Sequence, residues 1–95
     1  MSFTDSTVIR HANLVGETIL RAENDMSFTV ARAEKLDTFI VKARLISKPG
    51  LAHCLRLCTD GALNVVELDK RLRSVFITLK AHLRDEKAKQ ESELP

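Results

Sequence analysis

Two cysteines and a histidine lie close together in the middle of the chain and are the first candidates for chemistry. Cys54 and Cys58 are four residues apart and would share one face of a helix, with His53 beside them. A zinc site needs two further ligands, and no Cys-x-x-Cys pair or His-x-x-x-His spacing supplies them. We therefore expect both cysteines to be small buried hydrophobic residues, and we predict no metal site and no cofactor. A metal or redox site and an intermolecular disulfide are the alternatives.

The three histidines, His11, His53 and His82, are scattered along the chain and give no signature of a catalytic Cys–His pair. His82, near the end of a predicted helix, could pair with a carboxylate. The chain has no glycine-rich phosphate loop and no nucleophile elbow. We predict that the protein is not an enzyme, and we assign no catalytic residue.

Basic residues concentrate near the C-terminus, but acidic residues interrupt them. The net charge is only +2, which is too small for a bulk field that attracts nucleic acid or a membrane. A surface that follows phosphates should carry less acid than this one. Nucleic acid is therefore not the expected partner. The basic residues are Arg71, Arg73, Lys80, Arg84, Lys87 and Lys89, and the acidic ones are Glu67, Asp69, Asp85 and Glu86.

An apolar pattern with alternating steps of three and four residues covers the second half of the chain. This heptad spacing keeps one side of a helix facing another helix, as in a coiled coil. It predicts a helix over about 51–88, with a weak point at Gly61. The positions are Leu51, Cys54, Cys58, Gly61, Val65, Leu68, Leu72, Val75, Leu79 and His82, of which only Gly61 and His82 are not apolar.

The first half of the chain shows similar steps and predicts helices over about 5–24 and 27–47. Thr4, Asp5 and Ser6 are candidates for the N-cap of the first helix. A break at 24–27 and one continuous helix to residue 46 are both open. The second set of apolar positions is Val30, Ala33, Leu36, Ile40, Ala43 and Ile46.

Lys48-Pro49-Gly50 is the firmest boundary, because proline disfavours helix in the preceding residue and Pro-Gly marks a turn. Trp and Tyr are absent and Gly and Pro are few, so strand formers and turn residues are scarce. We predict an all-α fold: a helical hairpin or three-helix bundle, one domain over 1–90, with a long coiled-coil-like C-terminal helix. Residues 89–95 are expected to be a disordered tail.

The location predicted for the protein is cytoplasmic. The sequence contains no apolar run long enough to span a membrane and no secretory signal. Two cysteines without such a signal favour a reducing compartment.

One alternative fold places a helix-turn-helix on residues 51–86. The three helices would cover 51–59, 64–72 and 76–84, an order that resembles the DNA-reading helices of small winged-helix repressors. Three features oppose it: the turn at Arg73-Ser74-Val75 lacks glycine, no wing strands follow Leu83, and the apolar pattern continues through the turn.

The segment over 65–76 resembles the signature of the KxDL family of small eukaryotic coiled-coil proteins. The likeness extends upstream without a gap to residue 32. The signature Lys and Asp fall on Asp69 and Arg71, while its Leu is kept as Leu72. Matching positions include Arg32, Glu34, Lys35, Ser47, Leu51, Val66, Leu72, Ser74 and Phe76. The resemblance implies a non-catalytic subunit of a helical assembly, such as the lysosome-positioning complex BORC, on the cytosolic face of lysosomes.

We predict a non-catalytic helical subunit or adaptor that associates with other helical subunits, as a homo- or hetero-oligomer. Burying large apolar side chains against a partner helix would drive the association. On this interpretation, Leu72→Asp prevents assembly and leaves local helicity partly intact. A DNA-binding dimer that uses residues 51–86, and a bacterial or phage helical chaperone or anti-regulator, are the alternatives. The predicted interface residues are Leu51, Val65, Leu68, Leu72, Val75, Phe76, Leu79 and Leu83.

Overall fold

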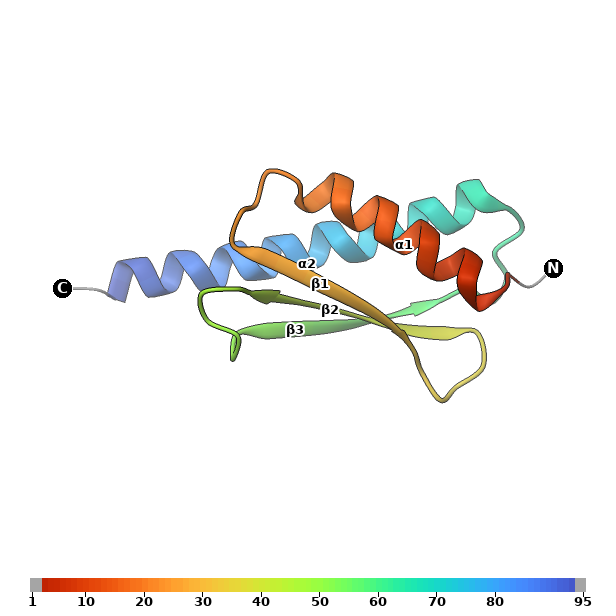
Figure 1. Ribbon diagram of the computed structural model, residues 1–95, viewed down its shortest axis with the longest axis horizontal. Helices are drawn as coiled ribbons and strands as arrows, with labels where there is room; N and C mark the ends of the chain where they lie inside the picture. The colour runs from red at the N-terminus through yellow and green to blue at the C-terminus, as the bar shows by residue number, and fades with distance from the viewer. Residues whose placement is uncertain (1–2, 94–95) are drawn as a thin grey trace.

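A computed structural model describes residues 3–93 as two helices and a three-stranded sheet. The strands form an antiparallel sheet in the order β1-β2-β3, and both helices lie on the same face of it (Figure 1). The prediction of an all-α fold, whether coiled coil or helical bundle, is therefore wrong. In chain order the elements are α1 (Asp5–Leu20), β1 (Met26–Arg32), β2 (Thr38–Leu45), β3 (Ala52–Cys58) and α2 (Val65–Glu93).

The helix predicted over 27–47 is replaced by the β1–β2 hairpin because the buried residues alternate with a period of two. Phe39, Val41, Ala43 and Leu45 are buried, while the intervening Lys42 and Arg44 are exposed. Alternation of this kind places one side of a strand on a core. The helical spacing had instead selected Leu36 and Ile46, whose side chains are 73% and 55% exposed.

The turn predicted at Lys48-Pro49-Gly50 is confirmed, but it joins two strands, β2 and β3. Residues 52–58 form a strand, so the long helix does not begin near Leu51. It begins at Val65, after a loop in which Gly61 adopts a left-handed conformation with φ 76°. That conformation is easy for glycine and unfavourable for other residues. Gly61 therefore lies in the loop that precedes the helix.

Side-chain caps set where both helices begin. The Thr4 hydroxyl accepts a hydrogen bond from the Thr7 backbone N–H at 3.2 Å, which confirms the N-cap expected at the start of α1. Before α2, the Asn64 side chain accepts from the Glu67 N–H at 3.1 Å, and the Glu67 carboxylate accepts from the Leu63 N–H at 3.0 Å. This reciprocal pair is a variant of the capping box. The sequence pattern Asn64-x-x-Glu67 thus fixes the helix start.

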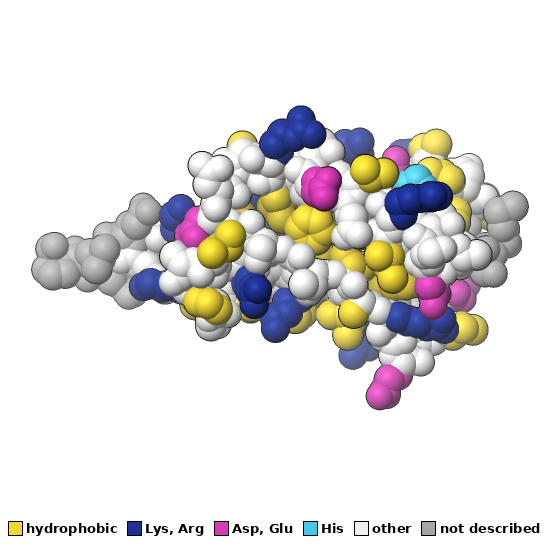
Figure 2. All heavy atoms as spheres, viewed as in Figure 1, with side chains coloured by type: hydrophobic (Ala, Val, Ile, Leu, Met, Phe, Trp, Pro, Cys, Tyr) yellow, Lys and Arg dark blue, Asp and Glu magenta, His cyan; other side chains and the backbone are white. Residues whose placement is uncertain are grey.

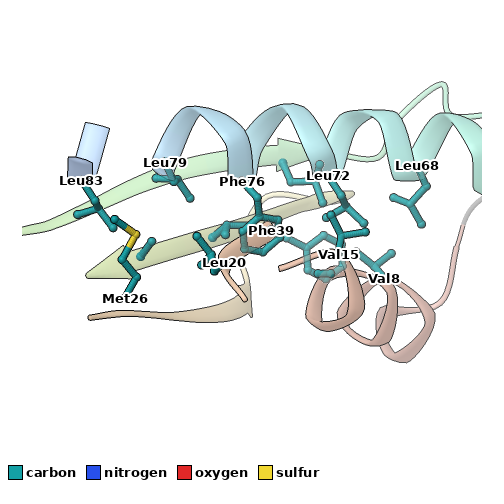
Figure 3. Close-up of a cluster of buried hydrophobic side chains, with 14 of the residues drawn as sticks. Val8, Val15, Leu20, Met26, Phe39, Leu68, Leu72, Phe76, Leu79 and Leu83 are labelled. Atoms are coloured by element: carbon teal, nitrogen blue, oxygen red, sulfur yellow. The ribbon is translucent and has the colours of Figure 1, made fainter. Parts of the chain in front are cut away.

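The core lies between the two helices and the inner face of the sheet (Figure 3). The two helices run parallel to each other: the start of α1 lies beside the start of α2, and the end of α1 lies beside later turns of α2 (Figure 1). At the far end, Lys80 Nζ donates to the Ile19 carbonyl at 3.0 Å, and the Arg84 guanidinium pairs with Glu23. Phe28 and Phe76 meet edge to face at 5.0 Å in the middle of the core.

Asp25 links the start of β1 to the end of β2. Its carboxylate accepts hydrogen bonds from the Ser47 hydroxyl at 2.7 Å and from the Ser47 N–H at 2.9 Å. The Asp25 carbonyl accepts from the Ile46 N–H at 2.8 Å. The two bonds from Ser47 stabilise the charged carboxylate, and Lys87 adds a smaller attraction, so the pKa of Asp25 lies below its ordinary value.

We expect Asp25→Asn to lower the free energy of unfolding at neutral pH but to have little effect in acid. Because the pKa is lower in the folded than in the unfolded chain, the carboxylate stabilises the fold above its unfolded pKa, and this stabilisation is lost as the pH falls through the folded value. Urea unfolding over a pH series checks this. Asp60→Asn, at an exposed loop position, is the control. A constant difference between variant and wild type at every pH would contradict the assignment.

Candidate functional site

Most of the predicted partner-interface residues lie inside the protein's own core. The side chains of Leu68, Leu72, Phe76, Leu79 and Leu83 are fully buried, and they face α1 and the sheet (Figure 3). In this fold they have no surface that a partner could contact. The other three are more accessible: Leu51 and Val75 are half-buried at the margin of the core, and Val65 is 42% exposed.

Cys54 and Cys58 are exposed, so the expectation that they are buried hydrophobic residues is wrong. They point away from the helices, on the outer face of β3, whereas His53 points inward on the same strand. Residues four apart in a strand are about 13 Å apart, which is too far for a disulfide between them. The sheet therefore separates the thiols from the imidazole that adjoins Cys54 in sequence.

The histidines are paired with other groups, but not with a nucleophile. The His53 ring stacks on His82 at 5.3 Å between ring centres, and His53 Nε2 lies 3.9 Å from Glu86 Oε1. His11 Nδ1 lies 3.8 Å from Asp69 Oδ1 across the two helices. Within the described part of the chain, no three His, Cys, Asp or Glu side chains are placed to hold a metal ion.

The helix-turn-helix arrangement considered for residues 51–86 does not match the structure. Its first helix would cover β3, and its turn at Arg73-Ser74-Val75 would fall in the uninterrupted middle of α2. In the described residues, therefore, this segment offers no separate recognition helix to a DNA groove.

The outer face of the sheet is left uncovered, because both helices lie on the other face (Figure 1). Small and β-branched side chains make up most of it, together with three cations and no carboxylate. Aromatic side chains are absent from this described face. In strand order, its residues are Ser27, Thr29 and Ala31, then Ile40, Lys42 and Arg44, then Ala52, Cys54, Arg56 and Cys58.

Both edges of the sheet carry unpaired backbone groups. Leu45 N–H donates to the Leu51 carbonyl, and Thr59 N–H to the Asp37 carbonyl, so the odd-numbered residues of β3 bond to β2. Because bonding alternates along an antiparallel pair, the N–H and C=O groups of Ala52, Cys54 and Arg56 point away from the sheet. The same reasoning applies to β1, where the Ala33 N–H donates to the Thr38 carbonyl. The backbone N–H and C=O groups of Phe28, Val30 and Arg32 therefore point away from β2.

A groove runs beside each edge. The groove between α1 and β1 has a volume of about 670 Å³, and its lining includes Leu20, Met26 and Phe28 together with Glu17 and Arg21. Figure 2 shows hydrophobic side chains gathered between these two elements. The groove between β3 and α2 measures about 360 Å³ and is lined by Arg56, Leu57, Cys58, Lys70, Arg71, Ser74 and Val75.

Arg71 closes one end of the β3 edge. Its guanidinium donates to the Cys58 carbonyl at 2.8 Å and to the Asp60 carbonyl at 2.7 Å. The outward carbonyl of Cys58 is therefore already bonded, whereas those of the preceding outward-facing residues are open. The helical spacing of residues 51–58 conceals this site in the sequence, although His53, Leu55 and Leu57 alternate as a strand requires.

No helix in residues 3–93 combines the length and apolar composition that crossing a bilayer requires. Comparisons with protein-family models, with curated proteins and with solved structures found no match for this chain. The features of the molecule that bear on function are the two sheet edges, their grooves and the uncovered sheet face.

Proposed function

We propose that the protein is a non-catalytic interaction subunit that binds a partner protein by accepting an extended segment of it as a fourth strand. The observation that carries this proposal is the pair of unpaired sheet edges, each with a groove between its strand and a helix. In strand addition, backbone hydrogen bonds provide affinity, and alternate side chains enter pockets and provide specificity. Both requirements have a structural counterpart here.

The β3 edge has few of the features by which proteins protect exposed strands. Protection comes from proline, lysine, bulges or a covering element. β3 contains no proline and one charged residue, Arg56, and its pairing with β2 runs without a bulge from Ala52 to Cys58. An edge left open in this way supports a role in which a partner covers it.

This proposal retains the predicted association with other proteins but changes its mechanism. The partner would contribute a strand to the sheet, and the apolar side of α2 would remain inside the core. A chaperone or anti-regulator that masks a segment of its partner would use the same edge. The location on the cytosolic face of lysosomes follows from the KxDL resemblance alone and stays a prediction. That likeness, over 32–76, includes β2 and β3 and only the last residue of β1, Arg32.

We expect a proline on one sheet edge, but not on the other, to weaken partner binding. Cys54→Pro removes an outward N–H from β3, and Val30→Pro removes one from β1. Proline is tolerated at such positions because the lost N–H is not used by the sheet. Blocking the edge in use should weaken binding about tenfold or more, since a hydrogen bond is lost and the added strand meets the proline ring.

The measurement uses the full chain purified from its native host with its bound proteins, which mass spectrometry then identifies. Calorimetric titration of one purified partner against wild type and both variants gives the affinities, and circular dichroism verifies that each variant is folded. The two proline variants serve as controls for each other. If the partner binds both with wild-type affinity, strand addition is not the mechanism of association.

A further inference from the structure

We infer that the β3 edge receives a segment in which acidic and apolar side chains alternate. This inference rests on the proposed function and specifies the edge and the chemistry of the partner. It starts from the groove between β3 and α2, where the outward backbone groups of Cys54 and Arg56 lie beside three cationic side chains.

The cations beside this groove lack acidic partners. Arg56, Lys70 and Arg71 line it, and no carboxylate does. None of the three takes part in an ion pair with a described residue, whereas Arg32, Lys80, Arg84 and Lys87 all do. The hydrogen bonds of Arg71 go to carbonyl groups, which hold its guanidinium in place but do not neutralise its charge. The groove therefore attracts negative charge.

The groove beside β1 has no such preference. Glu17 and Arg21 both line it, so charges of opposite sign flank that edge. An acidic segment would meet Glu17 as well as Arg21 there, whereas every charged side chain that lines the groove beside β3 is a cation. Charge complementarity thus selects the β3 edge.

The alternation follows from the two sides of β3. Arg56 lies on the outer face of the sheet, so every second residue of an added strand would lie on that side and meet its positive charge. The intervening residues would face α2, where the half-buried Val75 is an apolar part of the groove that they could contact. An acidic residue on one side and an apolar residue on the other therefore match the two surfaces.

The same cations could contact phosphates, but the groove favours a peptide. Single-stranded nucleic acids are held largely by stacking of bases on aromatic side chains. Phe39 and Phe76 are buried, and Phe3 and Phe28 pack against the core, so no phenylalanine lines this groove. A peptide uses the unpaired backbone groups of the edge, which a nucleic acid leaves unsatisfied.

The test uses a fluorescein-labelled short peptide of alternating Glu and Val, with binding to the full chain measured by fluorescence anisotropy at low salt. The comparison peptides are alternating Lys and Val, and a Glu–Val peptide N-methylated at every residue so that neither of its edges can donate a hydrogen bond. We expect the unmodified Glu–Val peptide to bind at least about tenfold more tightly than either. Amide resonances of Cys54 and Arg56 should shift on binding.

Arg56→Gln/Lys70→Gln should weaken binding of the Glu–Val peptide about tenfold. Neither residue contributes a side-chain hydrogen bond to the fold, and both are exposed. The matched control is Arg10→Gln/Lys48→Gln, which removes two exposed cations from other surfaces and should retain wild-type affinity. Equal affinity of the two double variants would overturn the inference, and so would equal affinity for the N-methylated peptide.

A labelled single-stranded thymidine oligonucleotide tests whether the groove binds nucleic acid instead of a peptide. If it binds more tightly than the Glu–Val peptide and displaces it, the groove is a phosphate site and the inference is wrong.

The proposed function and the further inference can fail separately. If Cys54→Pro weakens binding of the native partner but the Glu–Val peptide does not bind, strand addition stands and the acidic preference falls. If neither proline variant affects the native partner, the proposed function falls.

Discussion

Leu72→Asp is expected to unfold the isolated chain. Leu72 is fully buried between the helices and the sheet, so the substitution removes a large apolar side chain from the core and places a carboxylate there. Truncating a buried leucine alone costs about 2–5 kcal/mol, and an unpaired buried charge adds to this. Single domains are stable by only about 5–15 kcal/mol, so little or no folded population should remain.

Circular dichroism and urea unfolding of the purified variant provide the measurement. The matched control is Ile77→Asp, on the same helix, where the side chain is 57% exposed and the expected change is within about 0.5 kcal/mol. The coiled-coil interpretation makes the opposite prediction for Leu72→Asp: a soluble, partly helical chain that fails to assemble. A variant with wild-type unfolding would show that this side of α2 is not in the core.

Gly16→Val has the second-largest expected effect. A Cβ atom at Gly16 would lie 2.5 Å from Phe28 Cζ and 2.7 Å from Phe76 Cζ, closer than real Cβ contacts. The two rings pack against each other edge to face, and Phe76 is fully buried, so a larger side chain at residue 16 must displace the half-buried Phe28 ring and disturb its contact with Phe76. Overpacking of this kind costs about 1–3 kcal/mol or more, against a helix-propensity gain of a few tenths.

Urea unfolding of Gly16→Val should therefore give a midpoint well below that of the wild type. Gly50→Val is the control, because a Cβ there meets no atom within 4 Å. Replacing the Phe28 ring by the smaller leucine side chain, with Phe28→Leu in the Gly16→Val background, should recover part of the lost stability, since the two sites are in contact. Equal stability of the two valine variants would mean that the helix and the sheet are not so closely packed.

The sequence predicted the caps and turns of the fold better than it predicted which segments are helices and which are strands. The Thr4 cap, the turn at Lys48-Pro49-Gly50 and a helix through most of 65–88 agree with the structure, because each depends on local chemistry. Of the two alternatives left open for residues 24–27, the structure has the break, since α1 ends at Leu20. Strand residues were misassigned because a short apolar stretch satisfies two periods at once. Over 38–45, the alternating set includes Ala43, which also fits the helical steps.

The candidate site could not be predicted, because it depends on which elements become neighbours. Arg56, Lys70 and Arg71 are separated in sequence by the loop that contains Gly61, and they share a groove only after β3 packs beside α2. The heptad pattern also continued across Gly61 by coincidence, which concealed the change from strand to helix. Tertiary packing, rather than local propensity, decided between the two.

The bond from Arg71 to the Cys58 carbonyl shortens the edge of β3 that the proposed strand addition could use. With that end of β3 closed, three residues, Ala52, Cys54 and Arg56, each offer one donor and one acceptor. At about 1 kcal/mol per net hydrogen bond, such a short ladder contributes roughly 6 kcal/mol, before the cost of ordering the incoming segment. If the proposed strand addition is correct, the backbone bonds alone would therefore hold a partner only weakly, and its dissociation should be rapid.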